Sequence, residues 1–181
     1  MTQLSRKSLL MTAFAVAMGF STPVFAEAAK PLNDLEIAHS AYTADAIDIA
    51  YGNIALKKSH NPEVRKFAKL MVQDHTAVNK GAGELLAKLG VKPVDNDFSK
   101  ALNKGAAAKT AEFSKLNGRA FDLAYAQNEL AYHQAVNATV AGWIPTIQTP
   151  ELKSFLENAL VTFKAHENHA ANMVKNLQAA K

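Results

Sequence analysis

The sequence predicts an all-α domain, an antiparallel four-helix bundle built from two helical hairpins. Four long segments repeat apolar residues at three- and four-residue spacing, the pattern of amphipathic helices. The start signal Asn61-Pro62-Glu63 recurs as Thr149-Pro150-Glu151, and a phenylalanine follows at the same offset each time. Only 8 of the 181 residues are glycine, whereas alanine, leucine and lysine are frequent, which favours helix over strand.

The N-terminus has the pattern of a secretory signal peptide. Arg6 and Lys7 form a basic start, residues 9–20 form an apolar run, and small residues precede Ala26. The run is too short to span a membrane, so we expect removal by a signal peptidase rather than retention as an anchor. The predicted cut follows Ala26, with two later alanines, Ala28 and Ala29, as alternatives. This signal predicts a periplasmic protein, and peripheral association with the outer membrane remains open.

Removal of residues 1–26 leaves 155 residues, enough for one domain with a sizeable core. We expect residues 27–33 to form a flexible lead-in and residues 34–178 to form the bundle. The formal charge falls from +4 to +2 because Arg6 and Lys7 are removed, and so small a charge gives no reason to expect nucleic-acid binding. No cysteine is present, so neither a disulfide nor a thiolate metal ligand is available. No later apolar run is long enough for a transmembrane span.

The first hairpin is predicted from one sharp break. An amphipathic segment over residues 34–59 ends at His60-Asn61-Pro62, because the residue before a proline avoids the α region. Asn61 can cap a second helix, which we expect to continue to Leu89 and to stop at Gly90. A connection of two or three residues makes the two helices antiparallel neighbours.

The region between the hairpins is less regular. Residues 90–117 are interpreted as a crossover that contains a short helix over residues 97–102 and another turn or two near Phe113. A third long helix should follow Asn117-Gly118 and end near Ala141. A loop over residues 142–148 then leads into the last helix, which we expect over residues 149–177.

Polar side chains on the apolar faces are the candidate functional residues. A buried charge without a partner costs several kcal/mol, so such groups normally pair with one another or bind an ion. Bundle cores are known locations for metal sites made of carboxylates and histidines, and side chains four apart on a helix can face one ion. The sequence therefore predicts a divalent metal site formed by Asp48, His75, Glu129, His133 and His166.

Two other interpretations stay open. The same side chains can satisfy one another in a hydrogen-bond network, with Asp48 bonded to Tyr42, Tyr51 or His75, and the domain would then be a structural or interaction module without a metal. A di-metal oxidase is disfavoured because core carboxylates are few. No Ser-His-Asp spacing, phosphate loop or haem-attachment motif supports another enzyme class, so the sequence favours a binding protein over an enzyme.

Four stretches carry a resemblance to a known family: DIAYGNIAL, NPEVRKFAKLMVQDHTAVN, FDLAY with YHQAV, and TPELKSFL with His166. They resemble exported bacterial proteins of unknown function that contain a ferritin-like domain and often have an outer-membrane-protein label. The resemblance extends over about residues 34–178. It implies a ferritin-like four-helix bundle in the bacterial envelope and no particular activity.

The chain departs from that family's pattern at several positions. Asp48 stands where the family usually has glutamate, whereas His75, His133 and His166 match histidines of the family, and Asp74 matches the acid before the first of them. True ferritins carry Glu-x-x-His on two helices. The positions three before His75 and His166 are here Val72 and Phe163, which disfavours ferroxidase chemistry. The other departures are Glu129 for an apolar residue, Tyr132 for an acid and Val161 for a proline.

Overall fold

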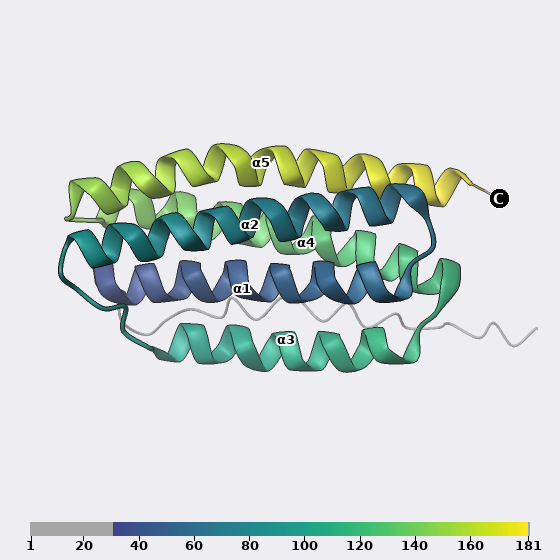
Figure 1. The fold of residues 1–181 in the computed structure, drawn as a ribbon, viewed down its shortest axis with the longest axis horizontal. Helices are drawn as coiled ribbons and strands as arrows, with labels where there is room; N and C mark the ends of the chain where they lie inside the picture. The colour runs from purple at the N-terminus through teal and green to yellow at the C-terminus, as the bar shows by residue number, and fades with distance from the viewer. Residues whose placement is uncertain (1–30, 181) are drawn as a thin grey trace, which may run out of the picture.

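The computed structural model describes residues 31–180, and this part of the chain is entirely helical, with no strand (Figure 1). The prediction of an all-α fold is therefore confirmed. The predicted signal peptide and most of the lead-in lie outside the described residues. The elements in chain order are α1 (Asp34–Lys58), α2 (Pro62–Lys88), α3 (Asp97–Lys115), α4 (Gly118–Trp143), the 3-10 helix η1 (Ile144–Thr146) and α5 (Pro150–Ala179).

Helices α1 and α2 form an antiparallel pair. Asn33 caps α1 and exchanges hydrogen bonds with Glu36 in a capping box. Asn61 caps α2, and Pro62 occupies its first turn, as the sequence predicts. The guanidinium of Arg65 donates to the carbonyl oxygens of Leu56 and Ser59, and so satisfies the open C-terminal end of α1.

The two helices approach closely at Gly52. A Cβ atom placed there would lie 2.8 Å from Val72 Cγ2 and 3.0 Å from the Ala68 carbonyl oxygen. Real Cβ atoms essentially never come within 2.8 Å of another heavy atom, and 3.0 Å to a carbonyl oxygen is tighter than most, so α1 and α2 pack at this distance because position 52 has no side chain.

Helix α3 differs from the prediction. The interpretation of residues 90–117 as an irregular crossover with a short helix was wrong, because residues 97–115 form one continuous helix. Asn96 starts it: the side chain accepts from Ser99 N and donates to the Glu36 carbonyl oxygen and Ser40 Oγ of α1. Phe113 is fully buried, with its ring 5.6 Å from that of Tyr51. These contacts with α1 stabilise a helix whose own sequence has a weak apolar stripe.

Helices α4 and α5 form the second antiparallel pair, joined through η1. Thr149 gives α5 no side-chain cap. Asp34, in the first turn of α1, contacts this end of α5 instead. Its carboxylate accepts hydrogen bonds from Thr149 N at 2.7 Å and from Gln148 N at 3.1 Å, just before the first turn of α5. Burial opposes ionisation of Asp34, yet these hydrogen bonds lower its pKa. The N-terminal end of α1 is thus hydrogen-bonded to the N-terminal end of α5.

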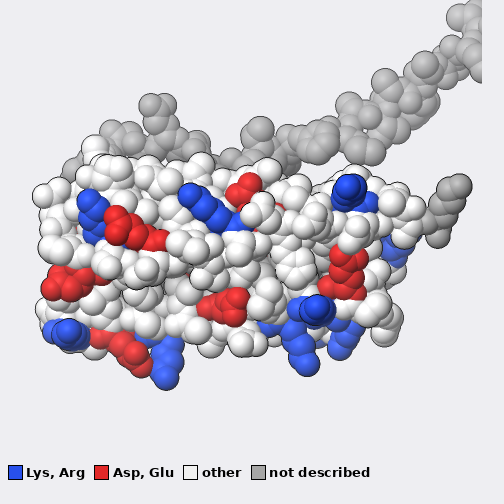
Figure 2. Space-filling model, turned by 90° about the horizontal axis from the view of Figure 1, so that it is seen from above, with Lys and Arg blue, Asp and Glu red and all other residues white. Residues whose placement is uncertain are grey.

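Within residues 31–180, helices α1 to α5 enclose one hydrophobic core. The pairs α1/α2 and α4/α5 lie side by side, and α3 runs along α1 on the side away from α5 (Figure 1). Acidic and basic side chains are interspersed on the face shown in Figure 2. Over residues 31–180, none of the helices combines the length and the apolar character that a membrane crossing needs.

Candidate metal centre

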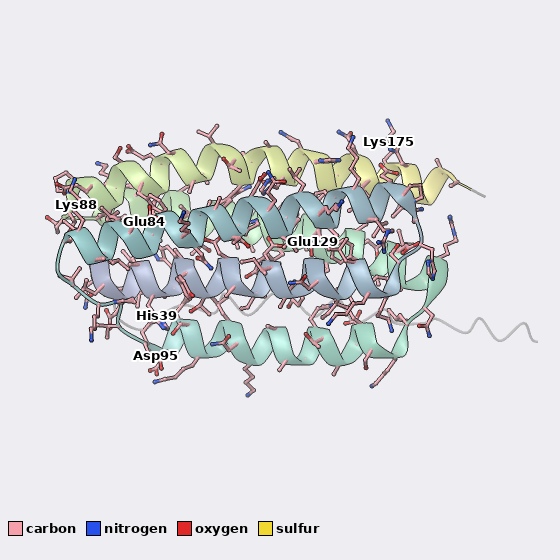
Figure 3. The ribbon with its side chains drawn as sticks, viewed as in Figure 1. His39, Glu84, Lys88, Asp95, Glu129 and Lys175 are labelled. Atoms are coloured by element: carbon pink, nitrogen blue, oxygen red, sulfur yellow. The ribbon has the colours of Figure 1, made fainter. Side chains whose placement is uncertain are left out.

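The five residues predicted as metal ligands come together in the core. They are Asp48 from α1, His75 from α2, Glu129 and His133 from α4, and His166 from α5, and none is more than 2% exposed. We call this set the inner cluster. Figure 3 shows Glu129 among the helices in the middle part of the molecule. Each member occupies a helix face that otherwise carries apolar residues, which is why helix packing brings the members together.

His75 is held between two aspartates of α1. Its Nδ1 lies 2.7 Å from Asp45 Oδ1 and its Nε2 lies 3.0 Å from Asp48 Oδ2. The ring stacks on Phe163, with centroids 5.1 Å apart and an interplanar angle of 11°. Burial opposes the charged ring, but the negative charge of Asp48 and the hydrogen bonds of both aspartates outweigh it and raise the pKa of His75 to about 10. Without a metal ion, His75 is an imidazolium at neutral pH.

His133 is fixed by its own helix. Its Nδ1 donates to the Glu129 carbonyl oxygen at 2.9 Å, one turn earlier. Its Nε2 lies 3.3 Å from Asp48 Oδ2 but makes no hydrogen bond to any described residue. Burial lowers the pKa of His133, and the positive charge of His75 adds to this effect. With its proton on Nδ1, the neutral ring has a free electron pair on Nε2.

His166 is fixed from the neighbouring pair of helices. Its Nε2 donates to Asp74 Oδ2 of α2 at 2.9 Å, while its Nδ1 has no hydrogen-bond partner within residues 31–180. Burial lowers the pKa of His166 to about 4, although the bond to Asp74 works in the opposite direction. This ring is therefore neutral as well, with its free electron pair on Nδ1.

The three carboxyl groups around these rings differ in charge. Burial disfavours ionisation of Asp48, but the positive charge of His75, with a smaller contribution from the adjacent His133, outweighs it and holds its pKa below the usual range. Burial and the charge of Asp48 raise the pKa of Glu129 well above its usual value, which favours its neutral form. Burial raises the pKa of Asp45 to about 6. The carboxylate of Asp48 lies 3.0 Å from His75 Nε2 and 3.3 Å from His133 Nε2, whereas neither carboxyl oxygen of Glu129 accepts a hydrogen bond from a described residue.

This geometry suits a metal ion. One ligand atom from each of the three histidines lies within 4.8 Å of the other two, and the same holds for Asp48, Glu129 and His133. Ligand nitrogens bound at 2.0–2.1 Å in a tetrahedron are roughly 3.4 Å apart, so small side-chain movements are enough. One nitrogen of each ring is anchored by a carboxylate or carbonyl group, the arrangement that orients metal-binding histidines.

Two contributors were missing from the sequence prediction. Asp45 anchors His75, and Asp74 anchors His166. Asp45 precedes Asp48 by three residues and so shares its side of α1, a spacing that could have indicated a second inward carboxylate. Asp74 was recognised only as part of an Asp-His pair. Because its neighbour His75 points inward, helical geometry gave no reason to expect Asp74 to reach another histidine.

Comparisons with solved structures show the fold. A protein described as a secreted DUF305 protein from Streptomyces coelicolor superimposes with a TM-score of 0.69 at 14% sequence identity, covering 82% of this chain and 95% of that one. CopM, solved in the Cu(II)-bound form, superimposes with a TM-score of 0.63 at 13% identity, covering 81% of this chain and 99% of that one. No curated protein sequence matches this chain.

The family is identified by sequence. Residues 21–173 match a family described as a domain of unknown function, and this range includes every member of the inner cluster together with Asp45 and Asp74. The match extends over far more than half of the chain. The chain therefore belongs to the DUF4142 family.

Proposed function

We propose that this protein binds a divalent transition metal ion in the inner cluster and acts as a metal-binding protein rather than as an enzyme. One observation carries the proposal. Three histidines from three helices converge in the core, each with one ring nitrogen anchored; the other nitrogen of His133 and of His166 has no hydrogen-bond partner among the described residues, and that of His75 faces the Asp48 carboxylate. Unpartnered buried polar atoms are costly, and a metal ion would satisfy all three nitrogens together with Asp48.

The donor set favours copper(II) as the first ion to test. Imidazole and carboxylate suit copper, zinc, nickel and iron, and within a given nitrogen and oxygen site copper(II) binds most tightly of the divalent first-row metals. The similar fold of CopM, solved with Cu(II) bound, supports the same choice. Without cysteine, a thiolate-rich zinc or iron–sulfur site is not available.

The proposal includes where and in what form the protein acts. We propose export through a signal peptide over residues 1–26, a lead-in over residues 27–33 and a domain over residues 34–178 in which α1, α2, α4 and α5 form a ferritin-like four-helix bundle. The periplasm is the proposed compartment, with loose association with the outer membrane as an extension. The basic and apolar pattern of the N-terminus supports export, as does the secreted description of the Streptomyces coelicolor protein.

A structural module without a metal is the second candidate. The position of His75 between Asp45 and Asp48 favours it, because the imidazolium and the two carboxylates satisfy much of one another's charge. This network leaves Glu129 and one nitrogen each of His133 and His166 without a hydrogen bond from residues 31–180. A di-metal oxidase is the least favoured candidate, since apolar Val72 and Phe163 stand where ferritins carry glutamate.

Metal analysis of protein purified without an affinity tag tests the proposal. We expect copper(II) titration to give one tight site per chain in the wild type, and His75→Ala or His133→Gln to weaken binding at least 100-fold. His60→Gln changes an exposed histidine and is the matched control, with binding unchanged. Circular dichroism of each variant checks the fold. If copper, zinc, manganese and iron all fail to bind or to raise the melting temperature of the wild type, the structural module is the better interpretation.

A further inference from the structure

Of the two carboxylates that hydrogen-bond a histidine of the inner cluster within residues 31–180, one is partly exposed to solvent and one is buried. The side chains of its five members and of Asp45 are at most 5% exposed, whereas the side chain of Asp74 is 26% exposed. Asp74 is also bonded directly to a cluster member, through His166 Nε2. A cation that approaches from the side of Asp74 therefore meets this carboxylate before the buried carboxylates of Asp45, Asp48 and Glu129.

His166 continues the path from Asp74 inward. Its ring centroid lies 5.2 Å from that of His75 and 5.4 Å from that of His133, so one ring contacts both the exposed carboxylate and the two buried histidines. Asp74 belongs to α2 and His166 to α5, helices from different antiparallel pairs. The path from Asp74 to His166 thus follows the contact between the α1/α2 pair and the α4/α5 pair.

The other approach to the cluster is apolar. Two small voids lie beside Asp45, each with room for about one water molecule. Both are lined mainly by carbon atoms, and Ala41 and Phe163 line both. Phe163 also covers the face of the His75 ring. Among residues 31–180, Asp45 is the only charged side chain that lines these voids, so an ion crossing them would lose most of its hydration for a single buried carboxylate, which is unfavourable.

We propose that Asp74 is the entry point of the metal site and that His166 is the ligand that moves during loading and release. This inference rests on the proposed metal-binding function. The carboxylate of Asp74 captures the hydrated ion, and the ion competes with His166 for the same oxygen. Once that hydrogen bond is broken, the His166 ring would be free to turn and pass the ion to Nε2 of His133 and to Nε2 of His75, whose proton would leave to solvent. Asp74 is thus a positioning residue that governs the rates of exchange.

Asp45 is the natural control. It forms a hydrogen bond with His75 as Asp74 does with His166, at 2.7 Å and 2.9 Å respectively, but it is buried. Glu63 is a second control, because it lies on α2, contacts α5 through Asn176 and is far along the helix from the cluster. Three variants, Asp74→Asn, Asp45→Asn and Glu63→Gln, each remove one carboxylate and keep the shape of the side chain.

Stopped-flow mixing of the metal-free protein with copper(II), followed by release into excess EDTA, measures the two rates. We expect Asp74→Asn to reduce the association rate roughly three- to tenfold and to flatten its dependence on ionic strength, because the charge at the entrance is lost. Glu63→Gln should leave both rates within about twofold. Asp45→Asn should change the affinity and the release rate while leaving the association rate nearly unchanged.

Two results would overturn the inference. If Asp74→Asn associates with copper(II) as fast as the wild type, or if Glu63→Gln slows association equally, Asp74 is not the entrance, although the metal site itself stands. If the wild type binds no copper(II), zinc, manganese or iron, both the entrance and the proposed function are wrong. Should Asp45→Asn fail to fold, the comparison of Asp74→Asn with Glu63→Gln still decides the outcome.

Discussion

His75 connects the two interpretations of the inner cluster. Its contacts with Asp45 and Asp48 make it an imidazolium with a pKa near 10 in the metal-free protein. A histidine must be neutral to bind a metal, so a metal ion and the His75 proton exclude each other. The hydrogen-bond network and the metal site are then two states of the same residues, with Asp48 facing a positive charge in both.

This exclusion predicts that metal binding releases protons. At pH 7.5, His75 holds a proton in the free protein, whereas His133 and His166 have lowered pKa values and are already neutral. We expect copper(II) binding to release about one proton from His75, and a further one if Glu129 ionises on binding the ion. Calorimetry in buffers of different ionisation enthalpy measures the number. Release of no proton at pH 7.5 would contradict the assignment of His75 as a ligand.

Glu129 gives a second prediction at this scale. A raised pKa means that its contribution to stability is complete below about pH 4.5 and is lost as the pH rises through the folded-state value. In chelated protein at pH 8, Glu129→Gln should therefore increase the free energy of unfolding by about 1–2 kcal/mol, because the amide can be buried without a charge and without the uptake of a proton. Urea unfolding at pH 5 and pH 8 tests this; a gain that is the same at both values would point to packing instead.

The five residues proposed from the sequence lie together in the core because each interrupts an apolar stripe, and their binding of a metal stays a prediction. The spacing of Asp45 could have shown that it faces inward, but the sequence could not show that His75 and His166 are anchored by Asp45 and Asp74. Both lie beside the stripe rather than on it, and a three-four pattern does not show which neighbouring helix a side chain at the edge will meet. Which ring nitrogen is anchored, and so which remains free, depends on that helix packing.

At the scale of the elements, helix ends were predicted well where a capping residue and a proline mark them. The predicted boundaries of α1, α2, α4 and α5 differ from the observed ones by a few residues at most. Helix α3 was not predicted as one helix, because Ala-rich residues 105–111 show little periodicity. Its stability comes from contacts with α1, which local sequence does not reveal.

The cap of α3 supports a prediction on stability. Asn96 is buried and satisfies groups of both α1 and α3, so Asn96→Ala should lower the free energy of unfolding by about 1–3 kcal/mol. Asn117 stands at the same place before α4 but makes no side-chain cap bond. Asn117→Ala should change stability by about 0.5 kcal/mol or less. Chemical denaturation compares the two, and equal losses would contradict this account.

The close approach of α1 and α2 supports another prediction on stability. Alanine is the better helix former, yet Gly52→Ala should destabilise the protein by about 1–3 kcal/mol, because its Cβ would collide with the Ala68 carbonyl oxygen. Gly83 in α2 is the control, since a Cβ there meets nothing within 4 Å. Gly83→Ala should stabilise by about 0.5–1 kcal/mol. In thermal melts, the melting temperature should fall for Gly52→Ala and rise for Gly83→Ala. A rise for both variants would show that the helices can move apart.

At the scale of the whole molecule, the ligands of the proposed site come from both helix pairs. Asp48 and His75 belong to the first pair, and Glu129, His133 and His166 belong to the second. A bound ion would therefore cross-link positions roughly 50 to 120 residues apart, and such links stabilise more as the closed loop becomes longer. The repeated start signal at Asn61-Pro62-Glu63 and Thr149-Pro150-Glu151 predicted the two hairpins, but which side chains meet between them required the structure.

This cross-link predicts a rise in melting temperature with metal. At a free copper(II) concentration about 100 times the Kd, binding to the folded state should add about 2.7 kcal/mol, or roughly 5–10 °C for a domain of this size. His133→Gln should show almost none of this shift, while His60→Gln should show all of it. Differential scanning calorimetry with and without EDTA measures it, and an equal shift in both variants would indicate binding elsewhere on the surface.

The division of the ligands between the two pairs has a consequence for how the protein would obtain its metal. Neither half of the chain contains the full ligand set, and an unfolded chain holds its histidines too far apart to bind one ion tightly. A chain that is exported before it folds therefore cannot carry an ion with it from the place of synthesis. The protein would bind its metal where folding is completed. The ions available in that compartment would therefore determine which metal is bound as much as the ligands do.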